Sequence, residues 1–119
     1  MLTLPELLIK EPSWRRDIIS AWITQEQNEI RIDWKAMAEK LRANHRSEAT
    51  LEQAYKILAE IGILSTSTKG NYIIKDGMGT NFNPSDRFGD PYYFTSRRDA
   101  EKYKIAFCCG ERVVLNAVE

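Results

Sequence analysis

Basic and aromatic side chains alternate in the last third of the chain, in a combination that can bind single-stranded nucleic acid. The segments are Arg87-Phe88, Tyr92-Tyr93-Phe94 and Arg97-Arg98. An aromatic ring can stack on a base while an arginine neutralises a phosphate. Arg97 and Arg98 also begin a predicted helix, whose free N–H groups can hold an anion. The alternative, which we favour, is that the aromatic residues pack a strand and the arginines stay in water.

The residue types that enzymes use for catalysis do not form a recognisable set in this sequence. His45 is the single histidine, and it has no partner set for a Ser-His-Asp triad. No glycine motif that cradles phosphate is present. Asp86 and Asp90 flank Gly89, and carboxylates around a glycine favour a turn over a metal site. We therefore expect a protein that is not an enzyme and that uses no cofactor.

The two cysteines, Cys108 and Cys109, are adjacent, so they do not form a disulfide with good geometry. Without a second cluster of ligands they do not make a zinc site either. We expect reduced thiols in a cytoplasmic protein. Residues 1–10 lack the cationic flank of a signal peptide and the apolar length of a membrane span. His45 is expected to be a capping or surface residue in a turn.

The composition predicts one ordinary globular domain. The chain has 119 residues, of which 43% are hydrophobic and 29% charged. Seventeen Lys and Arg balance seventeen Asp and Glu. A nucleic-acid-binding protein usually carries a basic excess, because phosphate neutralisation supplies much of its affinity. Here such binding would need basic residues gathered on one face.

Apolar residues recur at helical spacing in three segments of the N-terminal half. In the second segment they lie at i, i+3, i+4 and i+7, which is one face of a helix. These residues are Trp34, Met37, Ala38 and Leu41. Trp14, Trp22 and Trp34 are expected in the core, since large aromatic residues at this spacing usually pack inside. The predicted helices cover residues 14–26, 34–43 and 47–61.

Capping residues mark where these helices begin and end. Asp33 and Ser47 are the predicted N-caps of the second and third helices. Gly62 is predicted to end the third helix in the left-handed conformation. Residues 29–32, between the first two helices, alternate polar and apolar side chains and are predicted to form a short strand.

The remainder of the chain is rich in strand formers and turn residues. Residues 63–66 and 71–74 are predicted to pair as a hairpin around a polar loop. Residues 77–91 contain many Gly, Asn and Pro residues and are predicted to be a loop. The tail is predicted to be strand, helix and strand, with Ser96 and Asp99 as a capping box.

This order of elements is that of a winged helix-turn-helix. We therefore expect an α+β protein: a winged helix-turn-helix with a C-terminal strand-helix-strand extension. The predicted organisation has three parts. A winged-helix domain with an N-terminal helix covers 1–76, a loop covers 77–91, and the extension covers 92–119. The extension is expected to pack on the domain or to serve for association.

Seven positions in the third predicted helix and the strand after it keep a recognisable spacing: Ser47, Thr50, Ala54, Leu58, Gly62 and Ile63-Leu64. With this spacing, residues 30–75 resemble the DNA-binding domain of GntR-type winged-helix regulators. Residues 70–73 are similar to the end of that family's wing, and residues 37–41 to the first helix of its helix pair. The segment after Asp76 does not resemble the ligand-binding domains of the family.

The resemblance implies that the third helix enters the major groove of DNA and that the wing touches the backbone. The candidate nucleic-acid-binding residues are Arg46, Thr50, Gln53, Lys56, Lys69 and Asn71. The family often has arginines where this chain has Glu48 and Glu52. Two carboxylates at these positions repel the phosphates.

Two functions of different kinds therefore follow. The leading expectation is a small cytoplasmic DNA-binding transcriptional regulator that binds double-stranded DNA, as a homodimer through its N-terminal helix or its tail. The alternative is a winged-helix protein–protein interaction module without nucleic-acid binding. The neutral net charge and the two glutamates favour the alternative.

Overall fold

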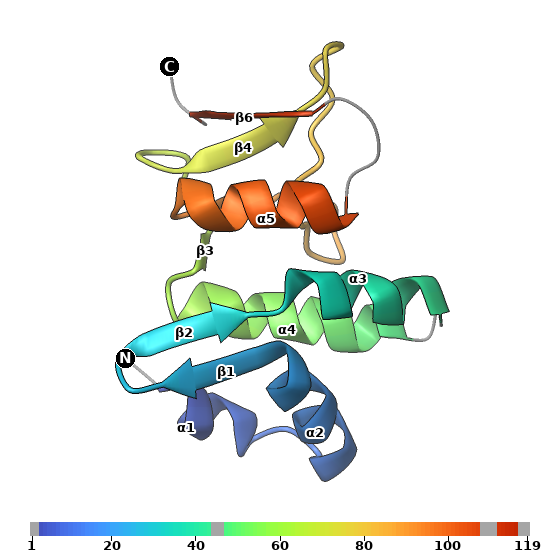
Figure 1. Cartoon of the computed structure of the whole chain (residues 1–119), viewed down its shortest axis with the longest axis vertical. Helices are drawn as coiled ribbons and strands as arrows, with labels where there is room; N and C mark the ends of the chain where they lie inside the picture. The colour runs from blue at the N-terminus through green and yellow to red at the C-terminus, as the bar shows by residue number, and fades with distance from the viewer. Residues whose placement is uncertain (1–2, 44–46, 108–111, 117–119) are drawn as a thin grey trace.

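The computed structural model describes residues 3–43, 47–107 and 112–116. These residues form five helices and six strands, which confirms the predicted α+β class. The N-terminal elements are α1 (Leu4–Leu8), α2 (Ser13–Trp22), β1 (Ile23–Glu26), β2 (Glu29–Ile32), α3 (Trp34–Ala43) and α4 (Glu48–Glu60). The C-terminal elements are β3 (Leu64–Ser65), β4 (Tyr72–Lys75), β5 (Tyr93–Phe94), α5 (Arg97–Phe107) and β6 (Val113–Asn116). In Figure 1, α1 to α4 and the β1–β2 hairpin lie below α5 and the second sheet.

The first predicted helix is four residues too long. Helix α2 ends at Trp22, and the next residues form β1, which pairs with β2 from Ile23 opposite Ile32 onward. The chain reverses at Gln27, which has a φ of 55°. Residues 24–26 include good helix formers, but their pairing with residues 29–31 decides their conformation. The β-branched Ile23 and Ile32 favour that pairing.

The predicted helix caps are confirmed at Asp33 and Gly62, whereas the predicted side-chain cap at Ser47 is wrong. Asp33 Oδ1 accepts a hydrogen bond from the Ala36 amide at 2.9 Å, as an N-cap should. Gly62 has a φ of 87°, the left-handed conformation that ends many helices. Ser47 makes no side-chain cap to α4. Its hydroxyl instead donates to the Lys40 carbonyl at 3.2 Å, so it links α4 to α3.

The predicted hairpin of residues 63–66 with 71–74 is wrong. The second sheet has the order β3-β5-β4-β6, so β5 lies between the two strands. Phe94 is opposite Leu64 on one side and Tyr72 on the other. Its side chain is fully buried, and its ring centroid lies 5.8 Å from that of Trp34. Burying a large aromatic side chain favours this insertion over a direct pairing of β3 with β4.

The predicted loop contains two turns built in the same way. Asp76 Oδ1 accepts from the amides of Met78 and Thr80, each at 2.9 Å. Ten residues later, Asp86 Oδ1 accepts from the amides of Phe88 and Asp90, at 2.9 and 3.0 Å. This confirms that Asp86 is a turn residue. An isolated β-bridge flanks each turn, so the segment is more regular than its composition predicts.

One core joins the N-terminal helices to the C-terminal sheet. Trp34 is 2% exposed, and its ring centroid lies 5.4 Å from that of Tyr103 on α5. Its Nε1 donates to Asp99 Oδ1 at 3.5 Å, and the Asp99 amide donates to Ser96 Oγ at the start of α5. The prediction of a core tryptophan is confirmed for Trp34 and Trp22. It is wrong for Trp14, which is 55% exposed because it lies away from the face that α2 buries.

Candidate functional site

Thr50 was expected on the exposed side of α4, and that expectation is wrong. The side chain is 3% exposed, so its hydroxyl does not reach the surface of the molecule. It lies in the first turn of α4, next to the buried Leu51. Thr50 therefore faces inward, since tertiary packing covers this end of the helix.

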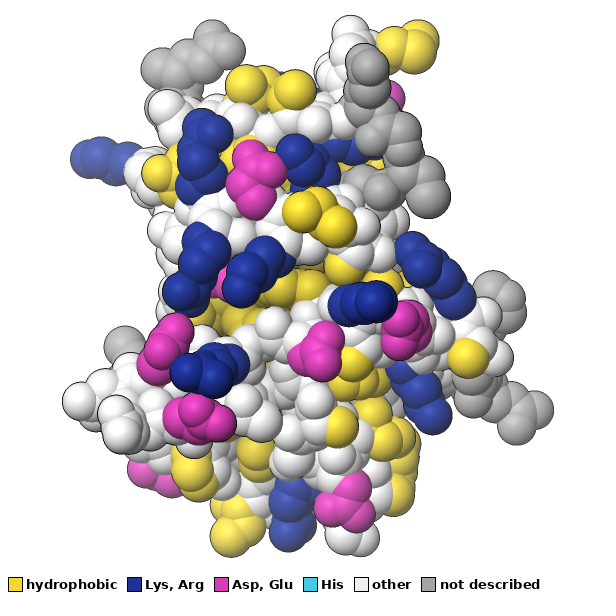
Figure 2. All heavy atoms as spheres, viewed as in Figure 1, with side chains coloured by type: hydrophobic (Ala, Val, Ile, Leu, Met, Phe, Trp, Pro, Cys, Tyr) yellow, Lys and Arg dark blue, Asp and Glu magenta, His cyan; other side chains and the backbone are white. Residues whose placement is uncertain are grey.

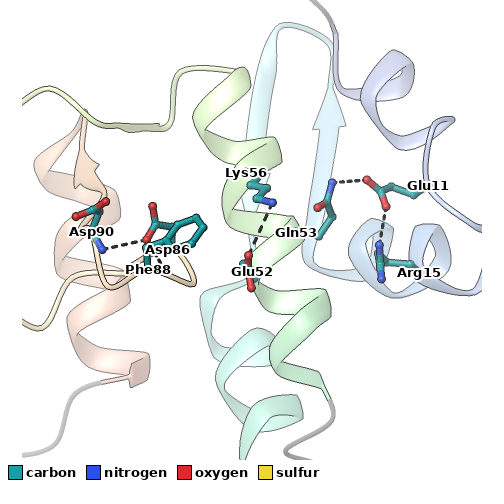
Figure 3. A network of polar contacts seen from close by, with 8 residues as sticks. All are labelled: Glu11, Arg15, Glu52, Gln53, Lys56, Asp86, Phe88 and Asp90. Atoms are coloured by element: carbon teal, nitrogen blue, oxygen red, sulfur yellow. Dashed lines mark hydrogen bonds and ion pairs between the residues drawn. The ribbon is translucent and has the colours of Figure 1, made fainter.

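Gln53 is half-buried and holds the helices together. Its Nε2 donates to Glu11 Oε1 at 2.5 Å, as Figure 3 shows. Glu11 itself is 8% exposed, and its second carboxylate oxygen accepts from Arg15 Nη1 at 3.1 Å. Arg16 Nη2 donates to the Glu11 carbonyl at 3.2 Å. Gln53 thus joins α4 to the α1–α2 turn, and its amide group is engaged within the protein.

The surface of α4 that remains accessible is acidic. Glu48 and Glu60 are exposed, and Glu52 is partly exposed. The ammonium group of Lys56 lies 3.8 Å from Glu52 Oε1, one turn earlier on the same helix. A helix surface with three carboxylates and one amine, itself paired, is unfavourable for binding in a DNA groove lined by phosphates.

The loop between β3 and β4 carries the last two predicted contact residues. Lys69 is exposed, whereas Asn71 is partly buried and closes the loop. Asn71 Nδ2 donates to the Ser67 carbonyl at 2.7 Å, and its amide donates to the Thr68 carbonyl at 3.1 Å. Arg46 and His45 lie outside the described residues, as do both cysteines. Among the described candidates, no hydrogen bond or ion pair joins one to another.

The basic and aromatic residues of the tail divide between core and surface. Tyr92 and Phe94 are buried, which supports the packing alternative for these two rings. Burial raises the pKa of the Tyr92 hydroxyl, as expected beside the ring of Tyr55. Arg97 lies over the ring of Tyr72, with its guanidinium carbon 5.6 Å from the centroid. Phe88 remains 75% exposed.

A groove that the sequence did not reveal lies between the β1–β2 hairpin, α3 and α5. Its volume is about 930 Å³. The apolar part of its lining includes Trp22, Ile30, Ile32, Trp34, Ile105 and Ala106. Ile105 is 79% exposed, so the groove has a large aliphatic side chain at its border. Figure 2 shows apolar surface between Lys and Arg side chains across the middle of this face.

The border of the groove carries charges of both signs. Helix α3 contributes Lys35, Glu39 and Arg42, and α5 contributes Arg98 and Lys102. Three of the groove's cations are engaged. Arg98 pairs with Glu29 at 3.6 Å, Arg31 pairs with Glu26 at 3.3 Å, and Arg42 donates to the Ala106 carbonyl at 2.9 Å. Within the described part of the chain, Lys35 and Lys102 form no ion pair.

The spacing of these residues was visible in the sequence, but their proximity was not. Lys35, Glu39 and Arg42 lie at i, i+4 and i+7, and so share one helix face. A face of this kind usually lies in water. It becomes one side of a groove only because α5, more than fifty residues later in the chain, packs against α3.

The comparisons with known proteins add no family. A scan against protein-family models gives no match, and searches of the curated proteins and of the solved structures give none either. The resemblance to GntR-type regulators therefore stays a prediction. No helix among the described residues is long and apolar enough to cross a membrane. The same residues contain no cluster of three or more His, Cys, Asp or Glu that could hold a metal ion.

Proposed function

We propose that this protein is a non-catalytic binding module that takes a segment of another protein into the groove between the hairpin, α3 and α5. The observation that carries the proposal is the apolar lining with exposed Ile105 at its border and charged side chains around it. An apolar centre with a polar rim is the common anatomy of a protein–protein interface. The acidic surface of α4 supports the same choice over the major groove of DNA.

Retention of proteins by the immobilised chain tests this proposal. Extract from the source cells is passed over the wild type, over Ile105→Glu and over Ile9→Glu. Ile9 is 70% exposed, does not line the groove, and serves as the matched control. We expect at least one protein that the wild type and Ile9→Glu retain and that Ile105→Glu does not. Equal retention by all three would contradict the proposal, because the substitution places a charge at the border of the groove.

Duplex DNA binding through the α3–α4 helix pair is the second function that we propose. The α3–α4 pair and its resemblance to GntR-type regulators favour it, together with the exposed amines of Lys56 and Lys69. A titration of labelled random-sequence duplex at low salt is the test. Binding should weaken steeply as salt rises and weaken again in Lys69→Ala. Absence of binding at micromolar protein would reject this second function without affecting the first.

A further inference from the structure

Strand β6 forms an open edge of the second sheet. It pairs with β4 over four residues, from Val113 opposite Lys75 to Asn116 opposite Tyr72. Among the described residues, no strand pairs with its other side. Figure 1 shows β6 along the upper margin of the molecule. Its outward N–H and C=O groups are therefore available to another strand.

The usual protections of an edge strand are missing from β6. Its sequence is Val113-Val114-Leu115-Asn116, which contains no charge and no proline. The other edges in the described part of the chain differ in this respect. Strands β1 and β2 carry charged residues, and β3 has only two residues. Charged side chains and short length are the features that keep edge strands from pairing with other chains.

The two faces of β6 also differ. Val114 is 6% exposed and packs toward α5 and the core. Val113 and Leu115 point to the opposite face and are 51% and 43% exposed. Leu115 is opposite Ile73 of β4, and Ile73 is only 6% exposed. The exposed apolar surface beside the open edge therefore consists of Val113 and Leu115 of β6 itself.

We propose that β6 pairs antiparallel with β6 of a second copy of this chain. A twofold axis would then place uncharged residues opposite uncharged residues along the whole strand, and Val113 and Leu115 of both copies on one face. Like charges, which destabilise directly opposed pairs, would not meet. The net charge of zero adds no long-range repulsion between copies. Two four-stranded sheets would join into one continuous sheet, independently of the groove.

The size of this contact sets its strength. Stable interfaces bury about 1,200–2,000 Å² in total, and four residues from each copy bury less than that. We therefore expect a concentration-dependent dimer with a dissociation constant on the order of 10–100 µM. A strand of this length and composition does not predict a permanent dimer.

Sedimentation equilibrium between about 5 and 500 µM tests the proposal. We expect the weight-average mass to rise toward twice the chain mass. Leu115→Lys and Val113→Lys each add a cation to both of the paired strands, so each should weaken dimerisation at least tenfold. Both side chains are about half exposed, which preserves the fold, and thermal unfolding verifies this. The control Ile9→Lys changes a more exposed aliphatic residue next to α1 and should leave the dimer unchanged.

Hydrogen exchange provides a second readout at the strand itself. Amides of residues 113–116 should become better protected at high protein concentration, because dimerisation covers the open edge. Monomeric protein throughout the concentration range would overturn the proposal. A dimer that both β6 substitutions leave intact, or that Ile9→Lys disrupts, would also overturn it and would place the contact on another surface.

Discussion

The Gln53 amide and the Glu11 carboxylate meet where α4 contacts the α1–α2 turn. Glu11 is almost fully buried, so its carboxylate oxygens need hydrogen-bond donors from the protein. We predict that Gln53→Ala lowers the free energy of unfolding by about 1–3 kcal/mol, since a buried acceptor loses its donor. Gln53→Glu should lower it further, because two carboxylates would face each other. Urea unfolding measures both changes.

Lys56 supplies the control for this prediction. It lies three residues further along the same helix, and its ion pair with Glu52 is 3.8 Å long and exposed. Lys56→Ala should therefore change the free energy of unfolding by less than about 0.5 kcal/mol. Equal losses for Lys56→Ala and Gln53→Ala would show that the contact with Glu11 does not stabilise the fold.

Asp76 gives a prediction about pH at the residue scale. The amide of Thr80, more than any other group, lowers the pKa of the Asp76 carboxyl from its ordinary value of 3.8. A depressed pKa in the folded state means that Asp76 stabilises the fold above pH 3.8. This contribution is lost as the pH falls through the lower folded value. The NMR titration of Asp76 should accordingly show a midpoint below 3.8.

A substitution tests whether the ionisation of Asp76 contributes to the free energy of unfolding. Asp76→Asn should be less stable than the wild type at pH 7, and the difference should shrink as the pH approaches 2. Asp17→Asn, which removes an exposed charge from α2, serves as the comparison. A difference between wild type and Asp76→Asn that is constant with pH would mean that the ionised carboxylate does not hold the turn.

At the scale of elements, β5 supplies much of the contact between the two layers through one side chain. Phe94 is fully buried, and its ring lies 5.8 Å from Trp34 and 5.2 Å from Tyr103. We predict that Phe94→Ala lowers the free energy of unfolding by about 3–5 kcal/mol, the cost of removing a buried aromatic ring. Chemical denaturation followed by tryptophan fluorescence measures it. Phe88→Ala, at an exposed ring, should be nearly neutral.

The sequence predicted helices better than it predicted sheet pairing, for a physical reason. Helices α3 and α4 follow from apolar residues at i, i+3, i+4 and i+7, which are local spacings. The position of β5 depends on Leu64 and Tyr72, which are distant in the chain. No local pattern in the sequence encodes which strands pair with β5, and the predicted wing hairpin was wrong for this reason. The groove stayed hidden likewise, because α3 and α5 meet only in the folded molecule.

The predictions for individual site residues were wrong where tertiary packing determines how exposed the side chain is. Thr50 and Gln53 occupy positions that a helical wheel places near the surface of α4. The α1–α2 turn covers Gln53, and the burial of Thr50 reflects contacts that the sequence of α4 does not contain. Lys56 and Lys69 were predicted correctly as exposed, since flexible amines are seldom buried. Their role in binding DNA stays a prediction.

At the scale of the whole molecule, the core predicts that the first 76 residues are not sufficient for a stable fold. Trp34 and Leu64 are each less than 3% exposed in the full chain, and both lie beside Phe94. A fragment of residues 1–76 would expose them. We predict a broad, weakly cooperative urea transition for this fragment, compared with a sharp one for the full chain. A sharp transition at the same urea concentration would show instead that 1–76 is an independent domain.

The insertion of β5 between two earlier strands has a consequence for synthesis on the ribosome. Leu64 and Tyr72 leave the exit tunnel before Phe94, which follows Leu64 by 30 positions. Until then β3 and β4 lack the strand that joins them, and the apolar face of α3 lacks its cover. The sheet is therefore completed only after β5 has left the tunnel, and the nascent helices form first because their contacts are local.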